Sequence, residues 1–350
     1  MLLPGGVIAL ALALAGCPAP PDDVHSNAEP ADPGTAIITW GSWQATPGNF
    51  VYPRSVVVVG SDGDGSDAGA SNLTIIVADK TRRLQFFDGN GTLRRCVPLH
   101  IHPDLSLKGY PVGISVRPTD GRLVVANTHY CELIWMSPDG TEELSRQGHT
   151  GSGPGEFMYP VRFAWRPDGG VYVAEYGHDQ HRIQQFDTDG NFVRTFGHYG
   201  TGDGGFDRIN GICTGPDGRV YACDAGNHRI QVFEADGTFV TTFGSFGDEP
   251  GQLKIPYGIC YEPIGDRLIV AEFAGSRLSV FRRDGTPLGH YTGADLANPW
   301  DVQVSQHFAF VPDYRHHRVV RIPLAALPGS PGLMGLSDPG HDREGTAQPR

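Results

Sequence analysis

Short runs in which apolar and polar residues alternate return along most of the chain at a nearly constant spacing. Each repeat contains a run such as GVYVAE or RLIVAE, followed by a second run such as RIQVF or RLSVF. The acidic or amide residues that end the first runs are Asp79, Asn127, Glu175, Asp224, Glu272 and Asp313, separated by 48, 48, 49, 48 and 41 positions. Alternation with a period of two is typical of half-buried β-strands, so the pattern predicts β-rich units and no long helix.

Turn residues divide each unit further. Segments such as GPDGR precede the first runs, and segments such as EADG follow the second runs. Proline presets one turn dihedral and glycine supplies a positive φ, so these segments predict hairpins. Each unit is expected to form four antiparallel strands, and six such units bury their faces when they pack around an axis. We therefore predict an all-β, six-bladed β-propeller over residues 35–323.

The last unit is one strand short, and a matching strand lies near the N-terminus. The segment TAIITWGSW at residues 35–43 matches TFVTTFGSF at residues 238–246, which is the end of an earlier unit. We expect this N-terminal strand to join the last blade and close the ring. Closure of this kind removes two open sheet edges.

The residues before the propeller predict export from the cytoplasm and attachment to a membrane. Residues 1–16 contain the apolar run VIALALALAG, which is typical of a secretory signal peptide. The tetrapeptide LAGC, ending at Cys17, resembles the lipobox of bacterial lipoproteins, whose cysteine is acylated; the alternative is an ordinary signal peptide followed by an unrelated cysteine. Residues 17–34 are interpreted as a lipidated cysteine and a disordered tether, and residues 324–350 as a disordered tail. We expect a lipid-anchored, extracytoplasmic protein of the bacterial cell envelope, in the outer membrane.

Charge and cysteine content narrow the expected partners. The formal net charge is -12, which argues against a nucleic-acid partner and against a polybasic membrane surface. The cysteines after Cys17 are Cys96, Cys131, Cys213, Cys223 and Cys260. Their number is odd and no CxxC motif occurs, so we expect buried hydrophobic side chains, although their disulfide state stays open. We expect the protein to be a monomer.

The units resemble NHL repeats. The resemblance rests on NHRIQVF at Asn227–Phe233, HRIQQF at His181–Phe186 and GPGEFMYP at Gly153–Pro160. It extends over about residues 35–323 and implies a six-bladed propeller with ligands at the face where loops surround the channel. It does not imply one function, because the family includes protein-binding and RNA-binding modules as well as lyases.

Five residues near the start of the innermost strands are candidates for ligand binding. The positions two residues after each repeat proline, or its isoleucine equivalent, hold Ser55, Gly113, Arg162, Gly211, Gly258 and Asp301. Arg162 and Asp301 depart from the small residues and fall in opposite units of a six-fold ring. Arg54, Tyr257 and Trp300 stand one position earlier in their units. We predict that these five residues meet a small polar ligand or a peptide. The alternative is a structural ion pair, or an arginine bonded to loop carbonyls.

Two sets of residues are candidates for metal binding. Asp62, Asp64 and Asp67, in the insertion SDGDGSDAGASN, have the alternating oxygen ligands of a calcium loop; an acidic hairpin loop is the alternative. Loop histidines that fall outside the repeat pattern could hold zinc, or simply be exposed; they are His129, His178, His198 and His316. The acids that end the first runs recur in every unit, so we expect them to bond loop amides or the repeat arginine.

Two classes of function stay open. The first is a binding platform that presents one channel face to a protein or a small ligand. The second is a metal-dependent propeller enzyme, similar to amidating lyases or to lactonases, that uses calcium or zinc at the channel mouth. Resemblance to amidating lyases implies zinc-binding histidines directly after the repeat prolines, but this chain has Arg54, Val112, Val161, Asn210, Tyr257 and Trp300 there. Resemblance to lactonases implies a calcium held by Glu, Asn and Asp, for which Glu175, Asn127, Glu272 and Asp301 are available. No catalytic residue is identified.

Overall fold

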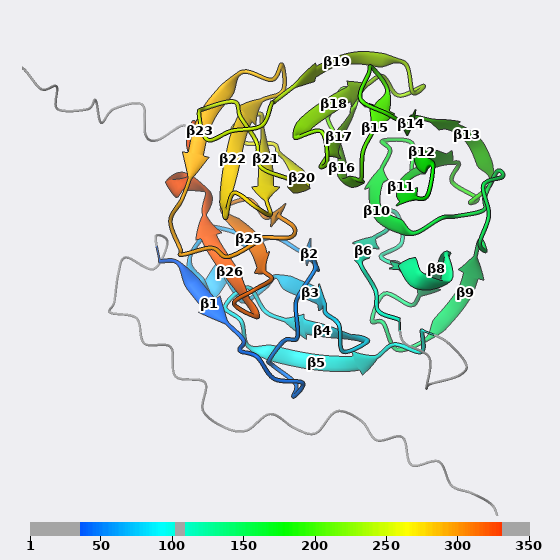
Figure 1. The fold of residues 1–350 in the computed structure, drawn as a ribbon. Coiled ribbons are helices and arrows are strands. Elements are labelled where there is room, and N and C mark those ends of the chain that lie inside the picture. Colours follow the sequence, from blue (N-terminus) through cyan, green and yellow to red (C-terminus); the bar gives the residue numbers. More distant parts are fainter. Residues whose placement is uncertain (1–35, 102–108, 331–350) are drawn as a thin grey trace, which may run out of the picture.

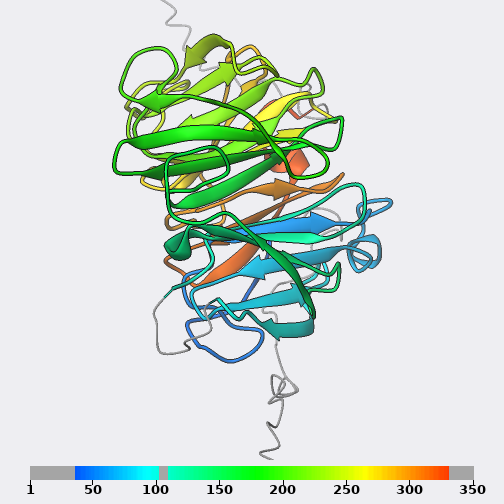
Figure 2. The same cartoon turned by 90° about the vertical axis from the view of Figure 1, so that its right-hand side faces the viewer.

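Six four-stranded antiparallel sheets surround a central axis, which confirms the predicted six-bladed β-propeller (Figure 1). The structure is a computed structural model that describes residues 36–101 and 109–330. Figure 2 shows the same ring from the side. The signal peptide, Cys17 and the tether to residue 34 lie outside the described residues, as does the tail from residue 331. Among the residues that the structure describes, no helix is long and apolar enough to cross a membrane.

Each of the first three blades begins with its innermost strand and ends with its outermost. Blade 1 consists of β2 (Ser55–Val59), β3 (Thr74–Ala78), β4 (Arg83–Phe87) and β5 (Leu93–Pro98). Blade 2 consists of β6 (Gly113–Val116), β7 (Leu123–Asn127), β8 (Glu132–Met136) and β9 (Glu143–Gln147). Blade 3 consists of β10 (Pro160–Trp165), β11 (Val171–Gly177), β12 (Gln180–Phe186) and β13 (Phe192–Phe196).

The remaining blades follow the same order, except that the last one takes its outermost strand from the N-terminus. Blade 4 consists of β16 (Ile209–Thr214), β17 (Val220–Asp224), β18 (Arg229–Phe233) and β19 (Phe239–Phe243). Blade 5 consists of β20 (Pro256–Glu262), β21 (Arg267–Glu272), β22 (Arg277–Arg282) and β23 (Pro287–Tyr291). Blade 6 consists of β24 (Gln303–Val304), β25 (Phe308–Asp313), β26 (Arg318–Pro323) and β1 (Ile38–Trp40). The short strands β14 (His198–Tyr199) and β15 (Gly205–Phe206) pair in parallel between blades 3 and 4.

The ring closes as the sequence predicts. Strand β1 pairs with β26 in antiparallel register, with Ile38 opposite Arg321 and Trp40 opposite Val319. Trp40 is buried and packs against Phe87 of blade 1 and Phe310 of blade 6. The closing strand is therefore held both by its hydrogen bonds and by apolar contacts across the joint.

The acids that end the second strands connect each blade to the loop before it. Asp224 accepts a hydrogen bond from the Asp207 amide at 2.8 Å and another from Arg229 Nε at 2.7 Å. Equivalent ion pairs with the repeat arginine occur at Asp79, Glu175, Glu272 and Asp313. Blade 2 differs, because Asn127 donates to Glu132 instead. The repeated acids thus have the structural role that the sequence suggested.

Close contact between innermost strands explains three glycines near the axis. A Cβ atom on Gly113, Gly211 or Gly258 would lie 2.0, 2.5 or 2.6 Å from the backbone of the adjacent blade. Any side chain there would push two blades apart. The equivalent positions in blades 3 and 6 hold Arg162 and Asp301, whose side chains must therefore find room in the channel.

The described fold continues beyond residue 323, where the sequence analysis ends the propeller. A short 3-10 helix, η2 (Leu324–Ala326), follows β26, and Leu327 is fully buried. Arg267 donates hydrogen bonds to carbonyls of this segment and to Ser330 Oγ at 3.0 Å. Residues 324–330 therefore pack on the body, although the sequence analysis predicts a disordered tail from residue 324. The other short helices are α1 (Asp67–Ala70) and η1 (Thr128–Tyr130).

Candidate functional site

The residues directly after the repeat prolines form one position per blade around the upper mouth of the channel. We call the upper face the one at which the second strand of each blade ends and the third begins. The six positions hold Arg54, Val112, Val161, Asn210, Tyr257 and Trp300. The residue two places before several of them has a positive φ, as at Tyr52 (54°) and Arg208 (54°), which turns the chain sharply into the innermost strand.

Arg162 and Asp301 meet across the channel below this ring. The Arg162 Nη2 atom lies 3.3 Å from Asp301 Oδ2, and both side chains are buried. The guanidinium group also donates to the carbonyls of Val112 and Arg54, at 2.8 and 3.0 Å. Burial raises the pKa of Asp301, and the charge of Arg162 opposes that shift. The pair ties opposite blades together, which agrees with the structural alternative stated above.

The Asp301 carboxylate also accepts hydrogen bonds from three protein groups besides Arg162. Its Oδ2 atom accepts from Ser55 Oγ and from the Val56 amide, both at 3.2 Å, and Oδ1 accepts from the Val302 amide at 2.9 Å. Two of these donors belong to blade 1, so the carboxylate joins three blades. Arg162 and Asp301 form a floor beneath the channel mouth, and a ligand on the upper face would meet the residues above them.

Above this floor, two cations lie among aromatic rings. The Arg54 guanidinium carbon is 4.4 Å from the centre of the Tyr110 ring and 4.7 Å from that of Trp300. Lys80 Nζ is 4.5 Å from the centre of the Tyr52 ring and 5.3 Å from that of Tyr110. Cation–π contacts of this kind contribute about 0.5–2 kcal/mol each, depending on exposure.

The rings continue into blades 5 and 6. Trp300 lies 4.9 Å from Tyr257 and 4.8 Å from Tyr314, measured between ring centres. Phe273 contacts all three of these rings. Arg208 shares a hydrogen bond with the Tyr257 hydroxyl, and this bond raises the pKa of the arginine. We call the following residues the central cluster: Tyr52, Arg54, Lys80, Tyr110, Arg208, Tyr257, Phe273, Trp300 and Tyr314.

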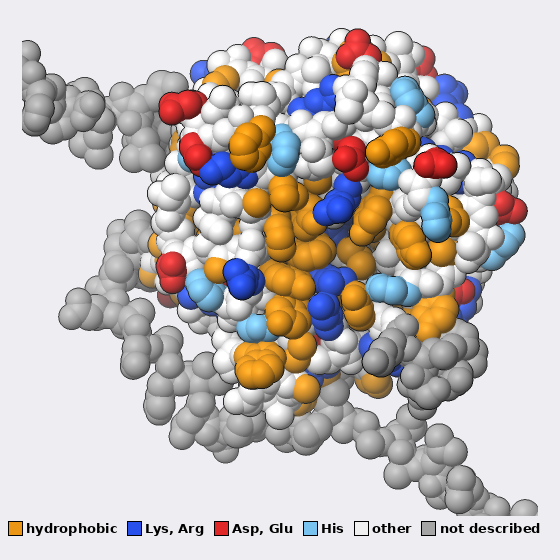
Figure 3. All heavy atoms as spheres, in the orientation of Figure 1, with side chains coloured by type: hydrophobic (Ala, Val, Ile, Leu, Met, Phe, Trp, Pro, Cys, Tyr) orange, Lys and Arg blue, Asp and Glu red, His pale blue; other side chains and the backbone are white. Residues whose placement is uncertain are grey.

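The central cluster is positively charged and incompletely bonded. Among the described residues, no carboxylate forms an ion pair with Arg54 or Lys80. Arg54 is 8% exposed, yet its Nε has no hydrogen-bond partner there, and the same holds for Trp300 Nε1 and for Oδ1 of Asn210, which is 2% exposed. Figure 3 shows basic and apolar side chains at the centre of the ring and most acidic ones farther out. Burial and the nearby Arg54 lower the pKa of His129.

Three histidines that precede the repeat arginine hold the loops around the cluster; we call them the repeat histidines. Nδ1 of His181, His228 and His317 accepts the amide hydrogens of Arg208, Ile255 and Tyr52, at 2.8, 3.1 and 3.1 Å. An accepting Nδ1 requires a neutral imidazole with its proton on Nε2. Burial lowers the pKa of each of the three, which favours that neutral form.

The three aspartates of the predicted calcium loop accept hydrogen bonds or form ion pairs with protein groups. Asp62 accepts hydrogen bonds from Ser305 and from the His307 amide, and Asp67 pairs with Arg321 at 2.5 Å. Asp64 accepts the Ser66 amide at 3.0 Å. Within residues 36–101 and 109–330, no three His, Cys, Asp or Glu side chains are grouped so that they could hold a metal ion, and this includes the extra loop histidines.

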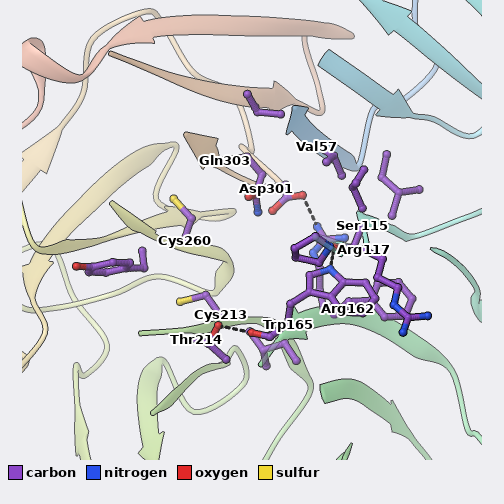
Figure 4. A pocket seen from close by; sticks show the side chains of 18 of the residues that line it. Val57, Ser115, Arg117, Arg162, Trp165, Cys213, Thr214, Cys260, Asp301 and Gln303 are labelled. Carbon is purple, nitrogen blue, oxygen red and sulfur yellow. Dashed lines mark hydrogen bonds and ion pairs between the residues drawn. The ribbon is translucent and has the colours of Figure 1, made fainter. Parts of the chain in front are cut away.

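Below the Arg162–Asp301 floor, the lower half of the channel forms a cavity of about 540 Å³ (Figure 4). Its walls come from the innermost strands, and Cys213, Cys260 and Gln303 are among the lining side chains. Burial raises the pKa of both thiols well above the ordinary value, so they are poor nucleophiles. No described cysteine forms a disulfide.

The structure brings the five predicted ligand-binding residues together at two depths. Arg54, Tyr257 and Trp300 lie in the central cluster, and Arg162 and Asp301 form the floor below it. Sequence reasoning missed Lys80, Phe273 and Tyr314. The sequence pattern could have identified them, because the position directly after each repeat acid also occurs once in every blade and lies at the upper face. The residues at this position are Lys80, Thr128, Tyr176, Ala225, Phe273 and Tyr314.

Comparison with known proteins supports the fold. The NHL repeat family matches residues 206–233, and no curated protein matches the chain significantly. Similar solved structures include the hydrazine synthase of Kuenenia stuttgartiensis (TM-score 0.54, 14% identity, 79% of this chain and 84% of that chain). Another is a protein of unknown function from Bacteroides thetaiotaomicron (TM-score 0.57, 13% identity, 82% of this chain and 76% of that chain). A third is streptogramin B lyase (TM-score 0.57, 13% identity, 85% of this chain and 87% of that chain). The chain is thus a six-bladed β-propeller in which one segment, residues 206–233, is similar to the NHL repeat.

Proposed function

We propose that the protein is a monomeric, lipid-anchored binding platform of the bacterial cell envelope, and that its upper face takes an anionic ligand at the central cluster. Arg54 supports this proposal most directly. Its guanidinium group is largely buried between Tyr110 and Trp300, and no carboxylate among the described residues pairs with it. A buried cation is costly unless an anion compensates for it, and a carboxylate or phosphate group on a ligand would do so.

Neighbouring groups add to the same preference. Lys80 shares the Tyr110 ring with Arg54, and Arg208 bonds to Tyr257, whose ring contacts Trp300, so both add positive charge to the cluster. Trp300 Nε1 offers a free donor and Asn210 Oδ1 a free acceptor. Aromatic walls with a few unpaired polar atoms are typical of small-ligand sites.

No described feature favours the enzyme alternative over binding. The positions at which amidating lyases are expected to hold zinc contain Arg54, Tyr257 and Trp300, which are not zinc ligands. The likeness to streptogramin B lyase, at 13% identity, concerns the fold alone. Binding needs no more than the charge and the rings described above, so it is the simpler proposal.

The chain enters the propeller from its lower face. Strand β1 runs antiparallel to β26, so its first residues lie toward the lower face. An acyl anchor at Cys17 would therefore connect to the lower side of the propeller, through a tether of residues 18–34 that spans up to about 60 Å when extended. Cell fractionation after labelling with a radioactive fatty acid tests the anchor. Label in the membrane fraction that disappears in Cys17→Ser supports it, and unlabelled soluble protein contradicts it.

Calorimetric titration of the purified protein, residues 18–350, tests the binding proposal. The probes are D-galacturonate and inorganic phosphate, each at low and at high salt. We expect at least one probe to bind and Arg54→Gln to weaken it about tenfold or more, because a hydrogen bond to a charged group contributes about 1.5–3 kcal/mol. Salt should weaken binding as well.

Arg282→Gln is the matched control. Arg282 is an exposed arginine at the lower end of β22, far from the cluster along its strand. Its removal changes the net charge as Arg54→Gln does, so an equal effect of both substitutions would point to general charge attraction. A well-folded protein that binds neither probe would refute the proposal.

A further inference from the structure

Aromatic rings extend from the central cluster to the rim of the upper face. From the centre outward, Trp300 contacts Tyr314 at 4.8 Å, Tyr314 contacts Tyr52 at 4.7 Å, and Tyr52 contacts His317 at 4.4 Å. His317 in turn lies 6.0 Å from Trp43, all measured between ring centres. Trp43 is 72% exposed, so this row of rings ends in solvent between blades 6 and 1.

A second row leaves the cluster on the other side. Tyr257 bonds to Arg208, and the charge of Arg208 also acts on Tyr176. The Tyr176 ring lies 6.3 Å from His181, and His181 lies 5.0 Å from Tyr199. Tyr199 is 55% exposed and belongs to the connection between blades 3 and 4. In a ring of six blades, that connection is half a turn away from Trp43. We call the two rows together the aromatic track.

The track does not simply follow from the repeat. Phe246 occupies the same repeat position as Trp43 and Tyr199, is 65% exposed and stacks on His228 at 4.9 Å. His228, however, holds the amide of Ile255, which lies outside the central cluster. The rows from Trp43 and Tyr199 reach the centre, and the one from Phe246 stops at its histidine.

Two rows of rings that end in the exposed Trp43 and Tyr199, with cations at the middle, fit an elongated ligand that carries negative charge at its centre. The main-chain amides beside the track are already bonded, since Tyr52 and Arg208 donate to the repeat histidines. Val51 and Asp207 likewise donate to the repeat acids. A peptide backbone would therefore find few partners there, whereas sugar rings need only flat aromatic surfaces and side-chain polar groups.

We infer that the aromatic track binds a linear acidic glycan, with a carboxylate-bearing sugar at the central cluster and flanking sugars on the rings toward Trp43 and Tyr199. This inference rests on the proposed function, because it names the ligand class of the same site. The whole chain carries a net charge of -12 although the cluster itself is basic, which favours a glycan in which acidic and neutral sugars alternate. A glycan of this kind would experience less electrostatic repulsion from the rim of the protein than a fully charged glycan.

Hyaluronan fragments test the inference, because they alternate uronate with a neutral sugar. We expect a decasaccharide to bind at least tenfold more tightly than a disaccharide. Trp43→Ala and Tyr199→Ala should each weaken decasaccharide binding about fivefold, the size of one aromatic contact, and leave the disaccharide unchanged. Phe246→Ala is the matched control, since it removes an equally exposed ring off the track and should change neither affinity.

The other outcomes separate this inference from the proposed function. Equal affinity for the two fragments would show a compact site, so the track would be refuted while the anion site stands. Loss of affinity in Phe246→Ala equal to that in Trp43→Ala would refute the track as well. If poly-L-glutamate binds as tightly as the decasaccharide, the ligand class would be an acidic peptide and the glycan would be refuted. Failure of hyaluronan, galacturonate and phosphate alike would refute the proposed function itself.

Discussion

The substitution Arg162→Met would remove the guanidinium group that connects blades 1, 2, 3 and 6 across the channel. In the folded protein this group pairs with Asp301 at 3.3 Å and donates to the carbonyls of Val112 and Arg54. Methionine has a similar length but no polar atom, so it leaves Asp301 and two carbonyls without their partner. Removal of one member of a buried ion pair costs about 3–5 kcal/mol.

The surroundings of Asp301 place the loss near the lower end of that range. Three donors remain on the carboxylate, from Ser55, Val56 and Val302, and they hold part of its charge. Burial already raises the pKa of Asp301, and without Arg162 the shift would be larger. A carboxyl that is easier to protonate escapes part of the penalty in acid. We therefore expect a loss of about 3 kcal/mol at pH 8 and a smaller loss at pH 5.

Urea unfolding, followed by tryptophan fluorescence and far-UV circular dichroism, measures this change. The double variant Arg162→Met/Asp301→Leu is the control, because replacement of the whole pair removes both charges and should restore most of the lost free energy. A loss below about 1 kcal/mol in Arg162→Met would refute the reasoning, since that is the size expected for an exposed pair. A double variant less stable than either single variant would refute it as well.

Three further predictions concern the closure, the axis and the loops. Trp40→Ala should lower the free energy of unfolding by about 3–5 kcal/mol, because a buried ring on the closing strand is lost; a change below 1 kcal/mol in urea unfolding would contradict the role of β1. Gly211→Ala should cost about 1–3 kcal/mol, since its Cβ would lie 2.5 Å from the next blade, whereas Gly202→Ala, with open space around it, should be neutral in the same assay. The lowered pKa values of the repeat histidines mean that the unfolded chain takes up protons first, so stability should fall as the pH drops below about 6.5. Buried carboxyls with raised pKa values change the stability in the opposite direction as the pH falls. The histidine effect is therefore measured as the difference in urea midpoint between wild type and His228→Gln, followed from pH 8 to pH 5. Identical pH profiles of the two proteins would rule it out.

Much of the architecture follows from local pattern. Alternation of apolar and polar residues locates the strands, and the recurrence of one acid per unit counts the blades. The similarity of residues 35–43 to 238–246 predicts which strand closes the ring, and β1 confirms it. These features can be predicted because every blade must bury both faces against its neighbours, so the same pattern of apolar residues recurs in each unit.

The site was only half readable. Arg54, Tyr257 and Trp300 stand at one repeat position, and comparison of the units singles them out. Their partners Lys80 and Tyr314 come from a different repeat position, which lies beside the first because the first two strands of each blade pair antiparallel. The contacts between blades, such as those of Arg54 with Tyr110 and Trp300, depend on how neighbouring blades meet in the closed ring.

The sequence by itself determined the fold class, the number of blades, the closing strand and part of the set of residues at the channel mouth, namely Arg54, Tyr257 and Trp300. The tertiary structure alone decided what those residues do there. It buries Arg162 and Asp301 against each other and saturates them, while Arg54 is left among rings without a counter-ion. The physical reason is that strand patterns depend on neighbours along the chain, whereas charge pairing and ring contacts depend on distances between blades that lie far apart in sequence.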